Sequence, residues 1–181
     1  MVCILLGNGF EEAEALVPAD LLRRAGADVV LTSLEGDQAV GSHHITVKTD
    51  KNLSEIDPKS VELVMLPGGL GGVKALGEEP GVAALVRAVL DQGGYAAAIC
   101  AAPTLLASLG LLDGTKAVCY PGMENEMAGA IIQPSVPFTV DGHIITGEAA
   151  GAVFPFGLKL VELLQGAEAA QRVKDAVHYH G

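Results

Sequence analysis

Short apolar runs alternate with segments of helical periodicity along the chain, and this alternation limits the fold more than any other feature. Residues 2–6, 61–66 and 95–99 are almost entirely apolar, as strands buried on both faces are. Strands of this kind that alternate with helices form βαβ units. The sequence therefore predicts an α/β fold, a mostly parallel sheet with helices on both faces.

The expected elements run from one end of the chain to the other. The predicted strands are 2–6, 28–34, 61–66, 95–99 and 117–120, with strand pairs at 39–40 and 44–47 and at 138–140 and 143–146. The predicted helices are 11–25, 82–92, 101–109, 149–164 and 167–177. Asp141-Gly142 is a strong hairpin signal between the last two strands. No linker-like composition interrupts the pattern, so residues 1–181 are interpreted as a single domain.

Cys100 occupies the corner where a predicted strand passes into a predicted helix. Ala98 and Ala102 lie two positions to either side, and a sharp strand-to-helix turn needs such small residues, as in the G-x-S-x-G elbow of hydrolases. The following helix directs its free N–H groups and positive dipole end at the sulfur, which favours the thiolate. Most free cysteines are buried and unreactive, but the corner position favours a reactive nucleophile.

Ligands of open parallel sheets bind at the carboxyl ends of the strands. This rule brings residues 7–14, residues 67–72 and the Cys100 corner together. Glu14, one turn into the first helix, is expected to point toward Cys100 and to keep its proton, because burial and a nearby negative charge raise a carboxyl pKa. It would donate a hydrogen bond to the sulfur and act as general acid or base. Glu11 and Glu12 are assigned to the helix N-terminus, where the dipole stabilises acids.

The turn Pro67-Gly68-Gly69 offers backbone without side chains in the way. The N–H groups of Gly69 and Ala101 are expected to converge on one oxygen as an oxyanion hole. Gly68 and Tyr120 are the predicted substrate-binding residues, although a buried phenol with a hydrogen-bond partner is the plainer interpretation of Tyr120. Cys3 and Cys119 are expected to be packed in the core.

The composition limits the partners. Eleven Lys and Arg against 22 Asp and Glu give a net charge of -11, which repels phosphate backbones and anionic lipid. We therefore expect neither nucleic acid nor membrane as partner. The N-terminus lacks the basic region of a signal peptide, and three cysteines in such a chain indicate reduced thiols in the cytoplasm. Metal-ligand spacings such as C-x-x-C are missing, so no metal and no cofactor is expected.

Four motifs, taken together, resemble a known family. They are G-F-E-E-A-E at 9–14, D-x-x-R-R-A-G at 20–26, L-P-G-G at 66–69 and A-A-I-C-A-A-P at 97–103. In this order and spacing they resemble the DJ-one (Parkinsonism-associated deglycase) branch of the ThiJ/PfpI superfamily. The resemblance implies a flavodoxin-like three-layer sandwich, similar to class I glutamine amidotransferases, and a homodimer. It also implies that Cys100 is an oxidisable nucleophile of low pKa, bonded to Glu14 and surrounded by the amides of Gly69 and Ala101.

The resemblance further implies protection against oxidative stress, glyoxalase or deglycase activity on reactive aldehydes, and chaperone activity. The chain departs from its relatives at several points. Glyoxalase-active animal members have a histidine where this chain has Tyr120, and protease-like relatives have one at the position of Ala101. The His-x-Glu pair of amidotransferases is also missing, which argues against protease and amidotransferase activity. Glu148 replaces the arginine of an Arg-Gly-Pro-Gly segment and is expected to change which anions the pocket tolerates.

Three functions therefore remain open. The first is an enzyme whose Cys100 adds to a reactive aldehyde. The second is a redox sensor without turnover, in which Cys100 oxidises to a sulfinate stabilised by Glu14 and the amides. The third is a binding module that keeps a thiol with an unperturbed pKa of about 8.5.

Overall fold

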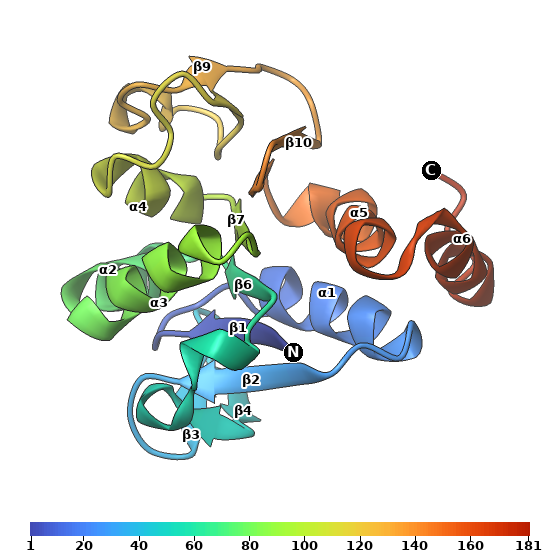
Figure 1. The fold of residues 1–181 in the computed structure, drawn as a ribbon, viewed down its shortest axis with the longest axis horizontal. Helices are drawn as coiled ribbons and strands as arrows, with labels where there is room; N and C mark the ends of the chain where they lie inside the picture. The colour runs from blue at the N-terminus through green and yellow to red at the C-terminus, as the bar shows by residue number, and fades with distance from the viewer.

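A seven-stranded sheet forms the middle layer of the computed structural model, which describes residues 1–181 (Figure 1). Its strand order is β10-β11-β7-β6-β1-β2-β5. These strands are β1 (Val2–Leu6), β2 (Val29–Ser33), β5 (Lys51–Asn52), β6 (Leu63–Leu66), β7 (Tyr95–Ile99), β10 (Phe138–Asp141) and β11 (Ile144–Gly147). Neighbouring strands are parallel except for β10, which pairs antiparallel with β11. The predicted mostly parallel sheet is therefore confirmed.

Helices cover both faces of this sheet (Figure 1). On one face lie α1 (Glu12–Arg24), α5 (Val153–Gln165) and α6 (Ala167–Ala176). On the other lie α2 (Leu70–Glu78), α3 (Pro80–Asp91) and α4 (Ala102–Ser108). Short 3-10 turns occur at Leu53–Glu55, Pro58–Ser60, Glu124–Glu126 and Ala150–Ala152. The result is a three-layer α/β/α sandwich with a separate hydrophobic core on each side of the sheet.

Strand β1 shows why the sequence pattern is apolar throughout. Ile4 and Leu6 belong to the core under α1 and α5, whereas Cys3 and Leu5 belong to the core under α3 and α4. Successive side chains of a strand point to opposite faces, so a strand covered on both sides needs apolar residues at every position. Cys3 is fully buried, as predicted, and its sulfur lies 3.3 Å from the Thr32 hydroxyl.

Two smaller strand pairs lie outside the main sheet. The hairpin of β3 (Gln38–Val40) and β4 (Thr46–Lys48) is antiparallel, as predicted for that segment. The pair of β8 (Lys116–Ala117) and β9 (Ile131–Ile132) is parallel. The prediction of a strand over 117–120 was wrong beyond Ala117. After that residue the backbone turns away, and the Tyr120 N–H donates to the Cys100 carbonyl oxygen at 2.8 Å.

Helix α2 was not predicted, because its sequence begins Leu-Gly-Gly and glycine disfavours helix interiors by about 1 kcal/mol. The glycines are needed for close packing. A methyl group on Gly72 would lie 2.7 Å from the Cα of Phe10, in the loop after β1. The start of α2 therefore packs directly against the backbone of that loop, at the edge of the sheet where Cys100 lies.

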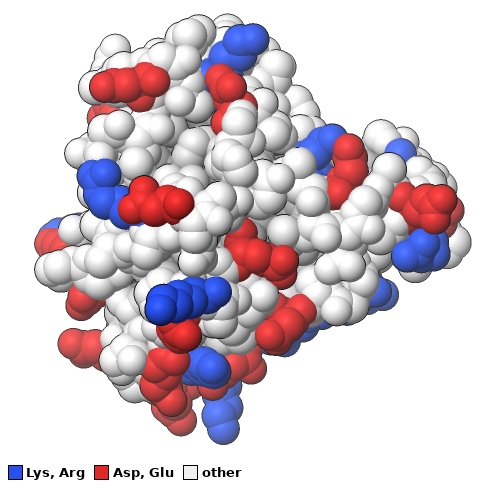
Figure 2. All heavy atoms as spheres, in the orientation of Figure 1, with Lys and Arg blue, Asp and Glu red and all other residues white.

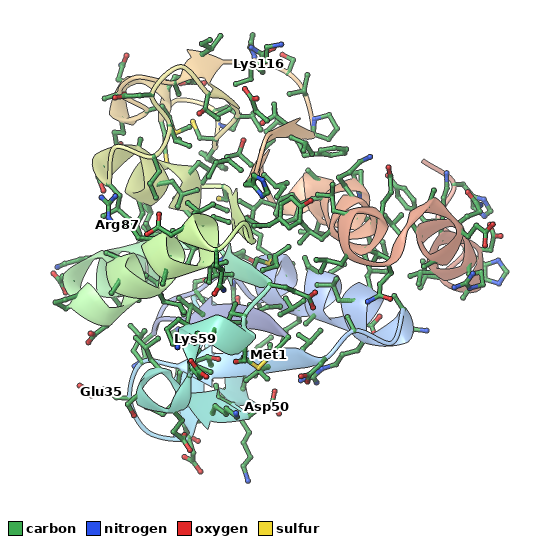
Figure 3. All side chains as sticks on the ribbon, viewed as in Figure 1. Met1, Glu35, Asp50, Lys59, Arg87 and Lys116 are labelled. Carbon is green, nitrogen blue, oxygen red and sulfur yellow. The ribbon has the colours of Figure 1, made fainter.

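The surface carries both signs of charge. On the face shown in Figure 2, acidic and basic side chains are interspersed over the elements rather than gathered in a basic patch. Arg87 of α3 lies beside α4 in Figure 3 and donates to the Leu109 carbonyl oxygen at 2.6 Å, after the last turn of that helix. None of the helices has both the length and the apolar character needed to cross a lipid bilayer.

Candidate active site

The backbone of Cys100 is held in an unusual conformation. It directly follows β7, and its φ of 67° lies in the left-handed region that non-glycine residues rarely adopt. Two hydrogen bonds fix it: its N–H donates to the Gly147 carbonyl at 3.0 Å, and its carbonyl accepts from Tyr120. The sulfur consequently projects from the end of the sheet and is partly exposed, whereas Cys3 and Cys119 are buried.

Glu14 reaches the sulfur from the first turn of α1. Its side chain is buried, with 1% of the residue exposed. One carboxylate oxygen accepts from the Gly68 N–H at 2.9 Å. The carboxyl group and the Cys100 sulfur both lie close against Gly68, so the two groups are neighbours. A methyl group on Gly68 would lie 2.6 Å from the Cβ of Cys100 and would collide with the Glu14 carboxylate. Only glycine at position 68 allows this close approach.

Both Glu14 and Cys100 have raised pKa values. Burial, with a smaller contribution from the charge of Glu11, raises the pKa of Glu14 to about 7 against the effect of its hydrogen bonds. Burial and the adjacent Glu14 carboxylate raise the pKa of Cys100 to about 12. The raised pKa of Glu14 agrees with the expectation of a carboxyl group that keeps its proton. The raised pKa of Cys100 differs from the expected low value, because burial and the Glu14 charge both oppose ionisation of the sulfur.

Gly69 and Ala101 bring their N–H groups to the sulfur, as the sequence analysis expected of the backbone there. Their hydrogen bonds to Cys100 lower its pKa, although less than burial and Glu14 raise it. Gly69 has a φ of 85°, and a Cβ there would lie 2.7 Å from the Glu11 nitrogen, so the turn requires glycine. Cys100, Glu14, Gly69 and Ala101 thus lie together at one end of the sheet.

A cavity of about 510 Å³ opens over the sulfur. Its lining residues are Glu11, Gly69, Leu70, Cys100, Ala101, Tyr120, Pro121, Gly122, Met123 and Glu126. Tyr120 is half exposed and lines this cavity, so its interpretation as a buried phenol was wrong. The predicted substrate-binding residue Gly68 does not line it, because Gly68 is buried beneath Cys100 and its N–H is taken by Glu14.

Several lining residues were missed from the sequence. Leu70 and Met123 supply apolar walls, and Glu11 and Glu126 supply carboxylates. The only signal for the segment 120–126 was its place after a predicted strand. Glu148, which the sequence analysis expected to influence the pocket, is not among the lining residues.

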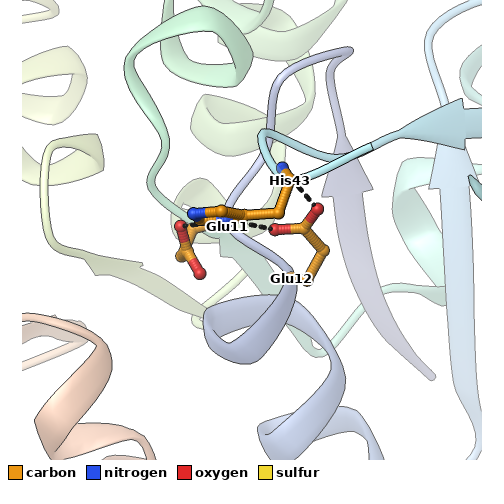
Figure 4. Close-up of side chains that lie close together, drawn as sticks. All are labelled: Glu11, Glu12 and His43. Atoms are coloured by element: carbon orange, nitrogen blue, oxygen red, sulfur yellow. Dashed lines mark hydrogen bonds and ion pairs between the residues drawn. The ribbon is translucent and has the colours of Figure 1, made fainter. Parts of the chain in front are cut away.

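Glu12 lies in the first turn of α1, as predicted, and has a further role. It is 6% exposed, and its carboxylate accepts from the His43 backbone N–H at 2.7 Å and from the His43 ring nitrogen Nδ1 at 2.9 Å (Figure 4). Burial opposes ionisation of Glu12, but these bonds outweigh it and lower its pKa to about 2. The bond to Glu12 raises the pKa of His43. Glu12 therefore ties the β3–β4 connection to the start of α1.

Ligand atoms of Glu11, Glu12 and His43 lie within 4.8 Å of one another. The Glu12 oxygens are already engaged by His43 and by the Ser42 hydroxyl. We interpret this group as a structural tie between the hairpin and the helix. Nothing in its geometry requires a metal ion.

Comparisons with known proteins agree with this geometry. The model of the DJ-1/PfpI family matches residues 1–163. Protein dj-1beta of Drosophila melanogaster is 38% identical over 172 residues, which cover 94% of this chain and 92% of that protein. Deglycase PH1704 of Pyrococcus horikoshii is 28% identical over 165 residues, or 91% of this chain and 99% of that protein.

The structural likeness is equally extensive. The solved structure of oxidized Toxoplasma gondii DJ-1 superposes with a TM-score of 0.94 at 31% identity, covering 99% of this chain and 98% of that one. The predicted flavodoxin-like sandwich is therefore confirmed. Because the family model spans most of the sequence and relatives of similar length match almost end to end, the chain belongs to the DJ-1/PfpI family.

Proposed function

We propose that this chain is a stress-response protein of the DJ-1 type that acts on reactive aldehydes through Cys100, in a glyoxalase- or deglycase-like reaction. The observation that carries this proposal is the close approach of Cys100 to the buried carboxyl group of Glu14, whose pKa is raised to about 7. A general base works best when its pKa lies near the working pH. The deglycase name of the Pyrococcus horikoshii relative adds support.

The first half of the reaction is the addition of sulfur to the carbonyl group. The Glu14 carboxylate accepts the thiol proton while the sulfur of Cys100 forms a bond to the aldehyde carbon. The carbonyl electron pair moves onto oxygen, and the alkoxide accepts hydrogen bonds from the N–H groups of Gly69 and Ala101. Glu14 then returns the proton to that oxygen, which gives a neutral hemithioacetal.

The second half applies to an aldehyde with a neighbouring ketone. Glu14 removes the proton from the hemithioacetal carbon, and the electrons pass to the ketone to form an enediol. Protonation of the former ketone carbon leaves a thioester on Cys100. Water hydrolyses this thioester to a 2-hydroxy acid and restores the thiol, so the net reaction adds one water and needs no external oxidant or cofactor.

Turnover of methylglyoxal by matched variants tests this proposal. Cys100→Ala should abolish turnover, and Glu14→Gln should lower kcat/KM by about 10²- to 10⁴-fold, the usual contribution of a general base. Cys119→Ala serves as control because it removes a buried thiol that does not line the cavity; it should retain turnover. Equal rates for the wild type and Cys100→Ala would refute the proposal.

The second candidate is a redox sensor without turnover. Cys100 is the one partly exposed cysteine of the three, and the Toxoplasma gondii relative was solved in an oxidized form. Two equivalents of peroxide would convert the thiol to a sulfinate and release two waters. Mass spectrometry after mild peroxide treatment should find the two oxygens on Cys100. Oxidation of Cys3 or Cys119 in preference to Cys100 would count against it.

We also propose that the chain forms a single domain, assembles as a homodimer in the cytoplasm and has chaperone activity. We expect it to bind neither nucleic acid nor membranes. Light scattering tests the homodimer directly: a chain of 18.5 kDa should elute with about twice that mass. A mass of one chain at micromolar concentration would contradict it.

A further inference from the structure

The charged side chains that line the cavity over Cys100 are all acidic. Among the residues that line it, Glu11 and Glu126 carry carboxylates, and none is lysine, arginine or histidine. The polar groups that face a reacting carbonyl are backbone N–H groups of Gly69 and Ala101, which carry no net charge. A ligand in this cavity therefore meets a negative wall beside the reacting sulfur.

Glu11 lies on the side of the cavity formed by the start of α1. Its side chain is 23% exposed, and its carboxylate accepts from the Ser42 hydroxyl at 3.1 Å. The nearest cation is His43, whose Nδ1 lies 3.6 Å from the Glu11 oxygen but 2.9 Å from the Glu12 oxygen. Because the shorter contact goes to Glu12, most of the charge of a protonated His43 is balanced there and not at Glu11.

Glu126 also lines the cavity, from the 3-10 turn Glu124–Glu126 that follows Tyr120. It is exposed and forms no ion pair with any cationic group of the chain. Glu124 adds a further negative charge beside it. Hydrogen bonds from the N–H groups of Glu124 itself and Gly122 lower the pKa of Glu124, and the Gly122 bond measures 2.9 Å. Since Gly122 lines the cavity, this bond holds Glu124 near its rim.

We propose that Glu11 and Glu126 make this cavity select neutral and cationic carbonyl compounds and reject anionic ones, such as those that carry a carboxylate or a phosphate. This inference rests on the proposed function in one respect: the carbonyl compounds are substrates only if Cys100 reacts with them. Coulomb repulsion through solvent-exposed space weakens the approach of an anion by about threefold for each carboxylate, or about tenfold for both. Salt should reduce this discrimination, because exposed charges are screened.

A pair of alkylating reagents tests the charge of the cavity without any turnover. Iodoacetamide is neutral and iodoacetate is anionic, and both alkylate a cysteine thiol. The ratio of their rates at Cys100, divided by the same ratio for the uncharged thiol N-acetylcysteine amide, should be about ten in favour of the neutral reagent at low salt. Peptide mass spectrometry identifies Cys100 as the alkylated residue.

Variants then assign the effect to its residues. Glu11→Gln and Glu126→Gln should each reduce the normalised ratio by about threefold, and Glu126→Lys should reduce it further. Because the charge of Glu14 also repels the anionic reagent, the ratio is measured at pH 9, well above the Glu14 pKa of about 7, so that Glu14 carries the same charge in every variant. Glu168→Gln on α6, far from the cavity in sequence and on another element, is the matched control and should leave the ratio unchanged. A wild-type ratio equal to that of the free thiol, or a ratio that neither variant moves, would overturn the proposal.

A matched pair of substrates separates this inference from the proposed function. Phenylglyoxal and 4-carboxyphenylglyoxal share the reacting aldehyde and ketone but differ by one negative charge. We expect kcat/KM to be about tenfold lower for the carboxylated compound. Equal values would refute the selection and leave the aldehyde activity standing. If neither compound is turned over while the alkylation ratio is high, the proposed reaction fails and the charge preference of the cavity remains.

Discussion

No histidine lines the cavity around Cys100, so the proton of its thiol has to pass to a carboxyl group. Glu14 is the acid in contact with it, and burial brings the pKa of this acid close to neutrality. One proton is thus shared between two groups that cannot both be negative at low cost. When Glu14 takes this proton, the main electrostatic obstacle to an ionised sulfur disappears.

This arrangement predicts a specific pH dependence. Below pH 7 the wild-type Glu14 is protonated and cannot accept the thiol proton, so the rate of alkylation of Cys100 by iodoacetamide should rise as the pH increases through about 7. Glu14→Gln should lose this step. Its thiol should instead ionise with a pKa lower by about 1 to 3 units, because the adjacent negative charge is gone.

Thiolate absorbance at 240 nm, recorded for both proteins over the same pH range, measures the second effect. Cys3→Ala and Cys119→Ala should be placed in both backgrounds, so that only Cys100 contributes to the signal. A thiol pKa that does not change in Glu14→Gln would show that the carboxylate does not control the sulfur.

Position along the chain decides which of these residues meet at the end of the sheet. Cys100 follows β7 and Glu14 follows β1, parallel strands with only β6 between them, so their proximity could be predicted. Which of them loses its proton first depends on burial and on the directions of N–H groups, neither of which the sequence states. For the same reason Glu11 was assigned to the helix end and Glu126 was not considered.

At the scale of elements, α2 shows how packing can outweigh helix propensity. Its glycines are unfavourable for a helix, yet they let α2 approach the loop after β1. The sequence pattern predicted strands β1, β6 and β7 because apolar runs report burial on both faces. It did not predict α2, because the close contact between the α2 backbone and the loop after β1 leaves no periodic pattern of apolar residues in the sequence.

Two alanine variants in this helix should have opposite effects on stability. Gly72→Ala would place a methyl group against the Phe10 backbone and should lower the free energy of unfolding by about 1–3 kcal/mol. Gly77→Ala lies in the same helix, where the new methyl would be 3.5 Å from a Leu105 methyl. It should raise the free energy of unfolding by about 0.5–1 kcal/mol. Urea denaturation measures both, and equal destabilisation would contradict the packing argument.

The contact between α1 and the β3–β4 connection is a second element-scale feature. Glu12→Gln should lower the free energy of unfolding by about 1–2 kcal/mol at pH 7, because its carboxylate accepts several hydrogen bonds. The native pKa of about 2 lies below the ordinary value of 4.5. The stabilisation is therefore complete above pH 4.5 and is lost as the pH falls toward 2.

Urea denaturation at pH 7 and pH 3 measures this difference between Glu12→Gln and the wild type. Asp20→Asn on the same helix is the control, because its ion pair with Arg24 is exposed and such pairs contribute little. If Glu12→Gln had no larger effect than Asp20→Asn at pH 7, Glu12 would not stabilise the hairpin.

At the scale of the whole molecule, the alternation of strands and helices was enough to predict three layers. The order of the strands could not be derived from that alternation. It depends on the direction along the sheet in which each connection between two strands runs. The resemblance of four short motifs supplied the flavodoxin-like arrangement, and the structural comparison agrees with it.

The net charge of -11 affects the molecule as a whole. Self-repulsion destabilises a compact state of high charge, so 0.5 M sodium chloride should raise the melting temperature at pH 7 by about 2–4 °C relative to low salt. The same comparison near pH 4.7, the isoelectric point expected from the sequence, should show a much smaller change. A melting temperature that falls with salt at pH 7 would indicate that attractive ion pairs outweigh the repulsion.

The left-handed backbone of Cys100 has a consequence for how stability and reactivity are related in this protein. A side chain in that region costs about 1–2 kcal/mol that glycine would avoid. Cys100→Gly should therefore melt at a higher temperature than Cys100→Ala, although both lack the sulfur. Glycine at position 100 is therefore expected to give the more stable protein but an unreactive one. The wild-type chain is less stable by this amount because it keeps a thiol at the mouth of the cavity.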